Sequence, residues 1–168
     1  MLPRTCGSWR PLAVLALAAL IGAAAGPTRG ASSVGEPQEP VQGALTLAPD
    51  TVRPGDTVTL TLRLTIADTW YVYRTAGSEG QRKLGLQLTL PPGLEPVGGW
   101  VWPPAQTVQE VRAVQIYTGT PAFTQRLRVG TATGAVPVAM SVSYQACNQE
   151  MCGPPATLDL STTLHVQS

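Results

Sequence analysis

Short runs of alternating hydrophobic and polar residues follow one another along the chain from Gly43 onward. The clearest run is Thr57–Ile66, in which every second residue is Val, Leu or Ile and the positions between them are Thr or Arg. Successive side chains of a β-strand point to opposite faces of its sheet. This run therefore predicts a strand with one buried and one exposed face.

Other runs rich in aliphatic, β-branched and aromatic residues predict additional strands. These runs are Ala44–Leu47, Trp70–Arg74, Leu84–Leu90, Trp100–Trp102, Val108–Tyr117, Ala122–Val129, Val136–Ala146 and Thr157–Val166. Clusters of Gly and Pro lie between them and mark turns. Many short strands without helical periodicity predict one all-β domain, folded as an immunoglobulin-like β-sandwich.

The composition supports this fold class. Charged residues make up only 12% of the 168 residues, whereas Gly (17) and Pro (16) are abundant, as expected for strands joined by many turns. The formal net charge is +1 and no long basic run occurs. A nucleic-acid partner, which would need a basic surface, is therefore not expected.

The N-terminus has the pattern of a secretory signal. Arg4 and Arg10 precede the apolar run Leu12–Ala25, which ends in small residues and is shorter than the roughly 20 residues of a membrane-spanning helix. We expect residues 1–25 to be a cleaved signal peptide and residues 26–42, rich in Gly, Pro and Ser, to be a disordered lead-in. Residues 43–168 would then form the single domain.

Removal of the signal changes the number of cysteines. Cys6 leaves with it, so that Cys147 and Cys152 remain, with four residues between them, in an oxidising compartment where they can form a disulfide. The loop that such a bond closes is short and would add only about 2 kcal/mol by the chain-entropy estimate. The spacing leaves open both a structural and a redox-active disulfide.

Few residues are candidates for a metal site or for another kind of catalytic site. A closed zinc site needs four N or S ligands, and His165, the only His, lies in a β-type run and is interpreted as an ordinary strand residue. Cys147, Met151 and Cys152 are three soft ligands on one loop, so Cu(I) binding remains an alternative. No nucleophile–base pair, paired carboxylates or phosphate-binding loop is evident, and no metal or cofactor is predicted.

The cysteine loop resembles a known active site. Tyr144-Gln145-Ala146-Cys147, followed after four residues by Cys152 and then Pro154-Pro155, is similar to the active-site loop of the N-terminal periplasmic domain of DsbD. Trp70–Arg74 resembles the aromatic strand of that family whose tyrosines flank the redox cysteines, and Ile116-Tyr117 resembles its cap loop. The resemblance extends from Ala44 to Val166.

This resemblance implies thiol–disulfide exchange in the periplasm. A domain of this family takes electrons from a membrane-embedded thiol reductant and passes them to thioredoxin-fold proteins. It implies that Cys152 forms the mixed disulfide with the partner and that Cys147 resolves it. Since the chain ends at Ser168, we expect the reductant and the acceptors to be separate proteins. The alternative is a non-catalytic immunoglobulin-like binding module with a structural disulfide.

The resemblance also implies roles for aromatic and aliphatic neighbours. Tyr71, Tyr73 and Tyr144 would form the wall of the site, and Ile116 and Tyr117 would form a cap over the sulfur atoms. The chain departs from the family pattern in two places. The cap carries Ile in place of Phe and lacks the two acids that precede it in the family, and the two cysteines lie one residue closer together.

Overall fold

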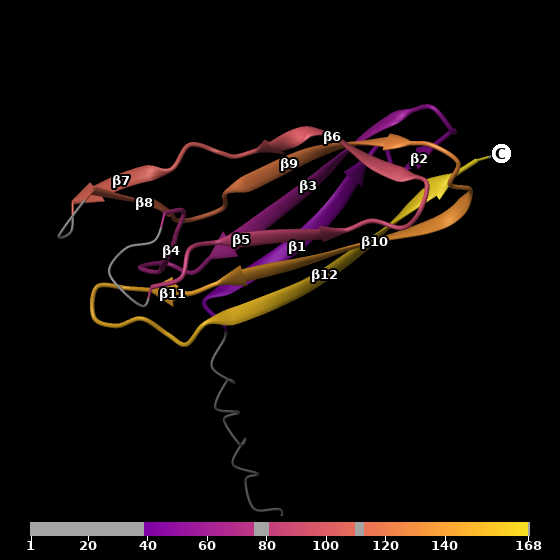
Figure 1. Ribbon diagram of the computed structural model, residues 1–168. Helices are drawn as coiled ribbons and strands as arrows, with labels where there is room; N and C mark the ends of the chain where they lie inside the picture. Colours follow the sequence, from indigo (N-terminus) through magenta and orange to yellow (C-terminus); the bar gives the residue numbers. More distant parts are fainter. Residues whose placement is uncertain (1–38, 76–80, 110–112, 168) are drawn as a thin grey trace, which may run out of the picture. The chain divides into compact units, whose positions relative to one another are not determined.

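The computed structural model describes residues 39–75, 81–109 and 113–167 (Figure 1). The expected signal peptide and most of the expected lead-in lie outside the described residues. All regular secondary structure in the described ranges is β-strand. Within those ranges no helix has the length and apolar character needed to cross a membrane.

The first sheet contains four antiparallel strands in the order β1-β3-β9-β6. They are β1 (Val41–Ala48), β3 (Thr57–Ile66), β9 (Ala122–Val129) and β6 (Leu94–Val101). The bounds of β3 and β9 are those predicted from their alternation. Strand β1 begins two residues before Gly43, the first residue of the predicted domain.

The second sheet has the order β2-β12-β10-β5. Its strands are β2 (Thr51–Val52), β12 (Ala156–Val166), β10 (Gly134–Tyr144) and β5 (Gly85–Thr89). The short strand β2, which the sequence pattern did not reveal, pairs parallel with the end of β12. The chain thus leaves the first sheet after β1 and joins the second within a few residues.

The inner faces of these two sheets form one hydrophobic core. Leu60, Leu62 and Leu64 of β3 and Val138 and Val142 of β10 are all fully buried and belong to the same cluster. The three leucines are two positions apart and the two valines four, so within each strand these residues lie on one face of the pleat. The predicted all-β, immunoglobulin-like sandwich is therefore confirmed.

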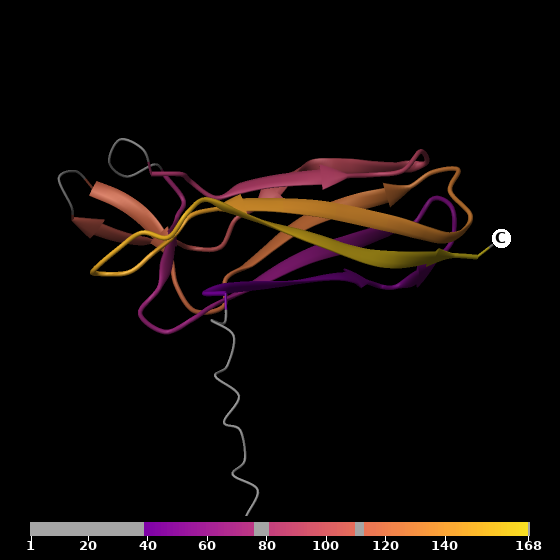
Figure 2. The same ribbon diagram turned by 90° about the horizontal axis from the view of Figure 1, so that it is seen from below.

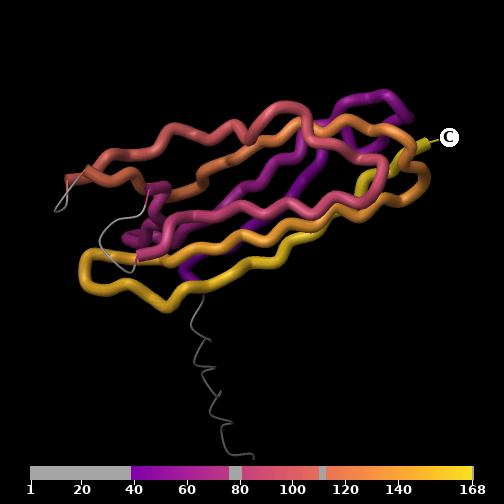
Figure 3. Tube along the Cα trace, in the orientation of Figure 1, coloured from indigo at the N-terminus to yellow at the C-terminus, as the bar shows by residue number. Residues whose placement is uncertain are grey.

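A third, smaller sheet has the order β11-β4-β8-β7. Its strands are β11 (Ala146–Cys147), β4 (Tyr71–Tyr73), β8 (Ala113–Tyr117) and β7 (Gln106–Gln109). Figures 1 and 2 both place this sheet at the end of the sandwich where β10 leads into β11. The trace in Figure 3 shows the loop after β11 reversing direction at that same end before it enters β12.

Two predicted strands are divided in the structure. The run Val136–Ala146 was expected to be one strand, but β10 ends at Tyr144 and Ala146 belongs to β11 of the third sheet. The run Val108–Tyr117 was expected to be a single strand, but its two ends are the paired strands β7 and β8, with Val108 opposite Val114. Residues 110–112, between them, lie outside the described ranges. The composition of the run is suitable for a strand throughout and gave no sign of a reversal of the chain.

The predicted strand Trp100–Trp102 was too short at its start. Strand β6 begins at Leu94, although Pro and Gly residues, which are unfavourable inside a strand, occupy several of its positions. β6 lies at the edge of its sheet and is irregular between Val97 and Val101. The buried amide of Gln125 donates hydrogen bonds to the carbonyl oxygens of Val97 and Gly98, at 3.2 and 3.3 Å, and so supports this irregular stretch.

Candidate active site

Cys147 and Cys152 form a disulfide, with an S–S distance of 2.05 Å and Cα atoms 4.0 Å apart. The backbone explains their proximity. The Asn148 N–H donates to the Met151 carbonyl oxygen at 2.8 Å, and the Gly153 N–H donates to the Ala146 carbonyl oxygen at 2.9 Å. These bonds flank the cysteines, which therefore form a non-hydrogen-bonded antiparallel pair, the type in which opposite Cα atoms approach most closely.

The turn between the two cysteines is held by Asn148. Its Oδ1 atom accepts hydrogen bonds from the N–H groups of Glu150 at 2.9 Å and Met151 at 2.8 Å. The Tyr71 hydroxyl donates to the Asn148 carbonyl oxygen at 3.4 Å and connects the turn to β4. Met151, 58% exposed, projects from the turn beside Cys152.

The two cysteines differ in accessibility. Cys147 is 0% exposed, because its side chain is packed among other side chains on one face of the third sheet, whereas Cys152 is exposed on the returning arm of the loop. Of the two cysteines, Cys152 is therefore the one that a large reactant from solution meets first.

A small hydrophobic cluster, separate from the main core, surrounds Cys147. It contains the buried side chains of Tyr73, Val114 and Ile116, with Tyr71 packed against it. Strand register explains the grouping, because Cys147 lies opposite Tyr71 and Tyr73 lies opposite Ile116, so that all four side chains share one face of the third sheet. The rings of Tyr71 and Tyr73 meet edge to face, with centroids 5.4 Å apart.

Tyr117 does not lie against the cysteines. It follows Ile116 in β8, so its side chain points to the opposite face of the third sheet and joins the main core. Its ring packs edge to face on Phe123, with centroids 5.2 Å apart, and stacks with Trp102 at 6.5 Å. Burial raises the pKa of the Tyr117 phenol, and the nearby positive charge of Arg74 lowers it in part.

Tyr144 also belongs to the main core rather than to the cluster around Cys147. Burial raises the pKa of its phenol, and the negative charge of Glu39 raises it further. Of the residues predicted for the site, the structure thus gathers Tyr71, Tyr73 and Ile116 around the disulfide. It does not bring Tyr117 or Tyr144 there.

Three residues near the disulfide were not predicted. The Gln81 amide nitrogen lies 3.9 Å from the Cys152 sulfur, within the range of a weak hydrogen bond. The Gln145 side chain accepts from the Arg82 N–H at 3.0 Å and donates to the Gly153 carbonyl oxygen at 2.9 Å. Val114 could have been found by its spacing of two from Ile116, but nothing in the sequence indicated Gln81.

The described residues offer no evident metal site. No group of three or more His, Cys, Asp and Glu side chains in the described ranges is arranged to hold a metal ion. His165 lies near the end of β12, opposite Ala135 and Thr51, whereas the cysteine loop leads into the start of that strand.

The sequence was then compared with known families. The family described as "Thiol:disulfide interchange protein DsbD, N-terminal" matches residues 39–164. The chain belongs to this family. Thiol–disulfide exchange is thus the chemistry of its family, and Cys147 and Cys152 lie at bonding distance on one loop. No curated protein sequence matched the chain.

Solved structures with a similar course of the backbone include DsbD N-terminal domains. The reduced DsbD N-terminal domain of Neisseria meningitidis is 14% identical, with a TM-score of 0.49, over 79% of this chain and 96% of that chain. The same domain in complex with the PilB N-terminal domain is 18% identical, with a TM-score of 0.48, over 82% and 97% of the two chains. The N-terminal periplasmic domain of ScsB from Proteus mirabilis is 16% identical, with a TM-score of 0.46, over 74% and 44%. The family assignment rests on the sequence match alone.

Proposed function

We propose that the protein carries electrons between protein dithiols through reversible reduction of the Cys147–Cys152 disulfide. Its membership of the DsbD N-terminal family supports this chemistry. The observation on which the proposal depends most is the unequal burial of the two cysteines, 0% exposed for Cys147 and exposed for Cys152. A thiol pair that exchanges with large partners needs one sulfur that the partner can reach. The second sulfur should be shielded from partners and react only with the first.

In the reductive half of the cycle, a thiolate of the donor attacks the Cys152 sulfur. A mixed disulfide forms, the Cys147–Cys152 bond breaks, and Cys147 leaves as a thiolate that takes up a proton. The second thiolate of the donor then attacks the donor sulfur that is bonded to Cys152 and releases Cys152 as a thiolate, which takes up a proton. The donor is oxidised to a disulfide, and this protein has gained two electrons and two protons.

The oxidative half reverses these steps on another protein. The Cys152 thiolate attacks the disulfide of the acceptor and forms a mixed disulfide, and Cys147 attacks Cys152 to restore the intramolecular bond and release the reduced acceptor. The hydrogen bonds of the turn keep the two cysteines opposite each other. This arrangement favours attack of Cys147 on Cys152, so the mixed disulfide is resolved quickly. Tyr73 and Ile116 shield Cys147, so that Cys152 remains its main reaction partner.

We propose that a membrane-embedded thiol reductant is the donor and that thioredoxin-fold proteins are the acceptors, as the family resemblance implies. We also propose a periplasmic location, which is consistent with the signal peptide expected at residues 1–25. Oxidising conditions there would keep the resting pair as a disulfide unless a dedicated donor reduces it.

Trapping of mixed disulfides tests the proposal. In Cys147→Ala the exposed Cys152 can attack a partner, but no second thiol resolves the product, so mixed disulfides with thioredoxin-fold proteins should accumulate. Cys152→Ala is the matched control. Its mixed disulfides should be at least about tenfold less abundant, because Cys147 is buried. Equal or greater trapping by Cys152→Ala would reverse the assigned roles. An absence of trapping in both variants would favour a binding module with a structural disulfide.

A further inference from the structure

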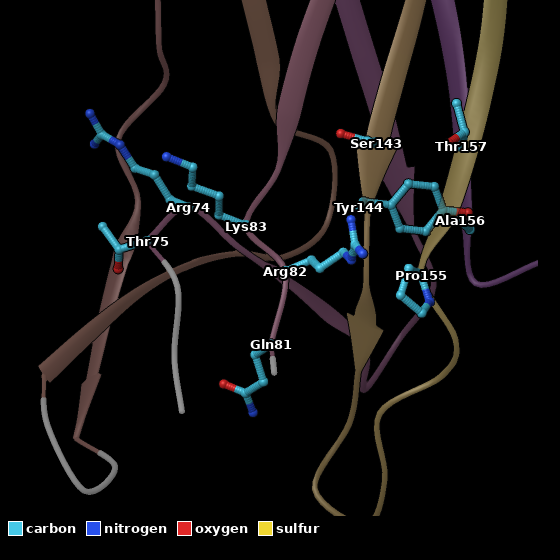
Figure 4. Close-up of a pocket in the computed structure, with 10 residues that line it drawn as sticks. All are labelled: Arg74, Thr75, Gln81, Arg82, Lys83, Ser143, Tyr144, Pro155, Ala156 and Thr157. Atoms are coloured by element: carbon cyan, nitrogen blue, oxygen red, sulfur yellow. The ribbon is translucent and has the colours of Figure 1, made fainter. Parts of the chain in front are cut away.

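A cleft of about 630 Å³ opens beside the cysteine loop (Figure 4). One side is formed by Arg74 and by Arg82 and Lys83, and the opposite side by Tyr144 at the end of β10 and Pro155 before β12. We call it the basic cleft. Figure 4 shows the Arg82 side chain extending toward Tyr144, whereas the Arg74 and Lys83 side chains, on the same side of the cleft as Arg82, point away from Tyr144.

The basic cleft concentrates positive charge in a nearly neutral protein. Its three cations are among only seven Lys and Arg residues in the described ranges; the others are Arg53, Arg63, Arg126 and Arg128. No carboxylate lines the cleft, and within the described ranges no acidic side chain forms an ion pair with any of the three cations. Arg74 and Lys83 also line a smaller neighbouring hollow of about 240 Å³ with Trp102, over whose ring the Arg74 guanidinium lies at 5.9 Å.

The basic cleft is directly connected to the reactive sulfur. Gln81, which lines the cleft, places its amide nitrogen 3.9 Å from the exposed Cys152 sulfur. The Arg82 backbone is bonded to the Gln145 side chain, which in turn is bonded to Gly153, the residue after Cys152. When the cysteine of a partner protein reaches Cys152, the partner residues next to that cysteine therefore lie across or beside the basic cleft.

We propose that the basic cleft binds an acidic segment of the partner protein, next to the cysteine that reacts with Cys152. The inference rests on the proposed function and adds the chemistry by which a partner is recognised. Two guanidinium groups and one ammonium group provide donors for several carboxylates, and guanidinium binds carboxylate in a bidentate manner. The cleft is much larger than one carboxylate, and Tyr144 and Pro155 offer apolar contact to a peptide chain.

The charges would act chiefly on encounter and orientation. Complementary charges at the rim of an interface raise the association rate and suppress wrong partners, and salt weakens their effect. Because the chain as a whole carries a formal charge of only +1, such steering must come from local groups of charges, and the basic cleft is one of these groups.

Peptide binding tests the inference without any redox step. The probes are two peptides of equal length, one with several Asp and Glu residues around a central Ser and one with Asn and Gln in their place. The oxidised protein should bind the acidic peptide about tenfold or more tightly than the neutral one, and less tightly as salt is raised. The double variant R82Q/K83Q should lose most of this preference.

The double variant R126Q/R128Q is the matched control. It removes the same charge from exposed positions of β9 in the other large sheet and should bind like the unmodified protein. Equal binding of the two peptides, or a preference that survives R82Q/K83Q, would overturn the inference. Glutathione disulfide that displaced the acidic peptide at equal concentration would also overturn it, because the cleft would then bind a small anion rather than a protein segment.

Failure of the proposed function and failure of this inference give different results. If the Cys147–Cys152 pair did not exchange with thiols, dithiothreitol would not reduce it, and a cysteine-containing form of either peptide would not form a mixed disulfide with Cys152 at a useful rate. If only the inference fails, dithiothreitol reduces the pair, both cysteine peptides form the mixed disulfide and release Cys147 as a thiol, and the acidic peptide has no advantage in rate. The advantage predicted for the acidic cysteine peptide is again about tenfold, and R82Q/K83Q should abolish it while changing the rate with dithiothreitol much less.

Discussion

Cys147 and Cys152 share one bond but face different surroundings. Cys147 points into a cluster with Tyr73 and Ile116, whereas Cys152 lies on the outer arm of the loop, near the Gln81 amide. This difference could not be predicted from two cysteines in one loop, because it depends on which of them pairs with β4. The family resemblance implies that Cys152 meets the partner, and this role stays a prediction that the trapping experiment tests.

Two buried tyrosines make stability sensitive to alkaline pH. Burial raises the pKa of both Tyr117 and Tyr144 above the ordinary value of 10.0. The folded state therefore binds these protons more tightly than the unfolded chain. Their contribution to stability is fully present below about pH 10 and is lost as the pH rises through the folded pKa values.

We accordingly expect the free energy of unfolding to fall as the pH rises above about 10, and to fall less in the double variant Y117F/Y144F. Chemical unfolding followed by circular dichroism over this pH range measures the effect. At neutral pH, Tyr117→Phe should cost only about 1 kcal/mol, because it loses one hydrogen bond, from the hydroxyl to the Pro103 carbonyl oxygen. An unchanged dependence on pH in the double variant would show that other groups are responsible.

At the scale of the element, β4 is the strand that assembles the site. Its three residues pair with β11 on one side and β8 on the other, so that Cys147, Tyr73 and Ile116 meet although they are far apart in the sequence. The alternation of β3 and β9 predicted their bounds. The third sheet could not be predicted in the same way, because its strands are very short and its partners are distant in sequence.

One error in the predicted site could have been avoided. Ile116 and Tyr117 were both expected to cap the cysteines, but they are adjacent residues of a strand and must point to opposite faces. A loop at this position would have allowed both to face the sulfur atoms. The structure places Ile116 in the cluster around Cys147 and Tyr117 in the main core.

The turn between the cysteines offers a prediction for a single side chain. Asn148→Ala removes the acceptor of the Glu150 and Met151 N–H groups, and we expect a cost of about 1–2 kcal/mol in local stability. Amide hydrogen exchange at Met151 should become about tenfold faster or more. Gln149→Ala, an exposed neighbour in the same turn, is the control and should leave this exchange unchanged. Equal protection of Met151 in the two variants would show that the turn does not depend on Asn148.

At the scale of the whole molecule, the described domain separates stability from chemistry. The main core fills the space between the two large sheets, whereas a second, small cluster encloses Cys147. Substitutions in the first cluster should therefore unfold the domain more readily without changing the reactivity of the disulfide. Substitutions in the second cluster should change the reactivity of the disulfide and cost less stability.

A matched pair of aliphatic truncations tests this separation. Leu62→Ala should lower the free energy of unfolding by about 2–5 kcal/mol, because Leu62 is fully buried in the main core, and should leave the rate of reduction by dithiothreitol unchanged. Ile116→Ala should cost less stability and raise that rate, because it uncovers Cys147. If Leu62→Ala changed the rate as much as Ile116→Ala, the two clusters would not be independent.

The reduction potential of the Cys147–Cys152 pair decides between a redox-active and a structural disulfide. Equilibration of the oxidised protein with dithiothreitol or glutathione buffers of known potential, followed by quantification of free thiols, measures it. We expect a potential above about −300 mV, in the range of exchanging proteins such as thioredoxin at about −270 mV and protein disulfide isomerase at about −180 mV. A potential below about −300 mV, as structural disulfides of secreted proteins have, would contradict electron transfer through this pair.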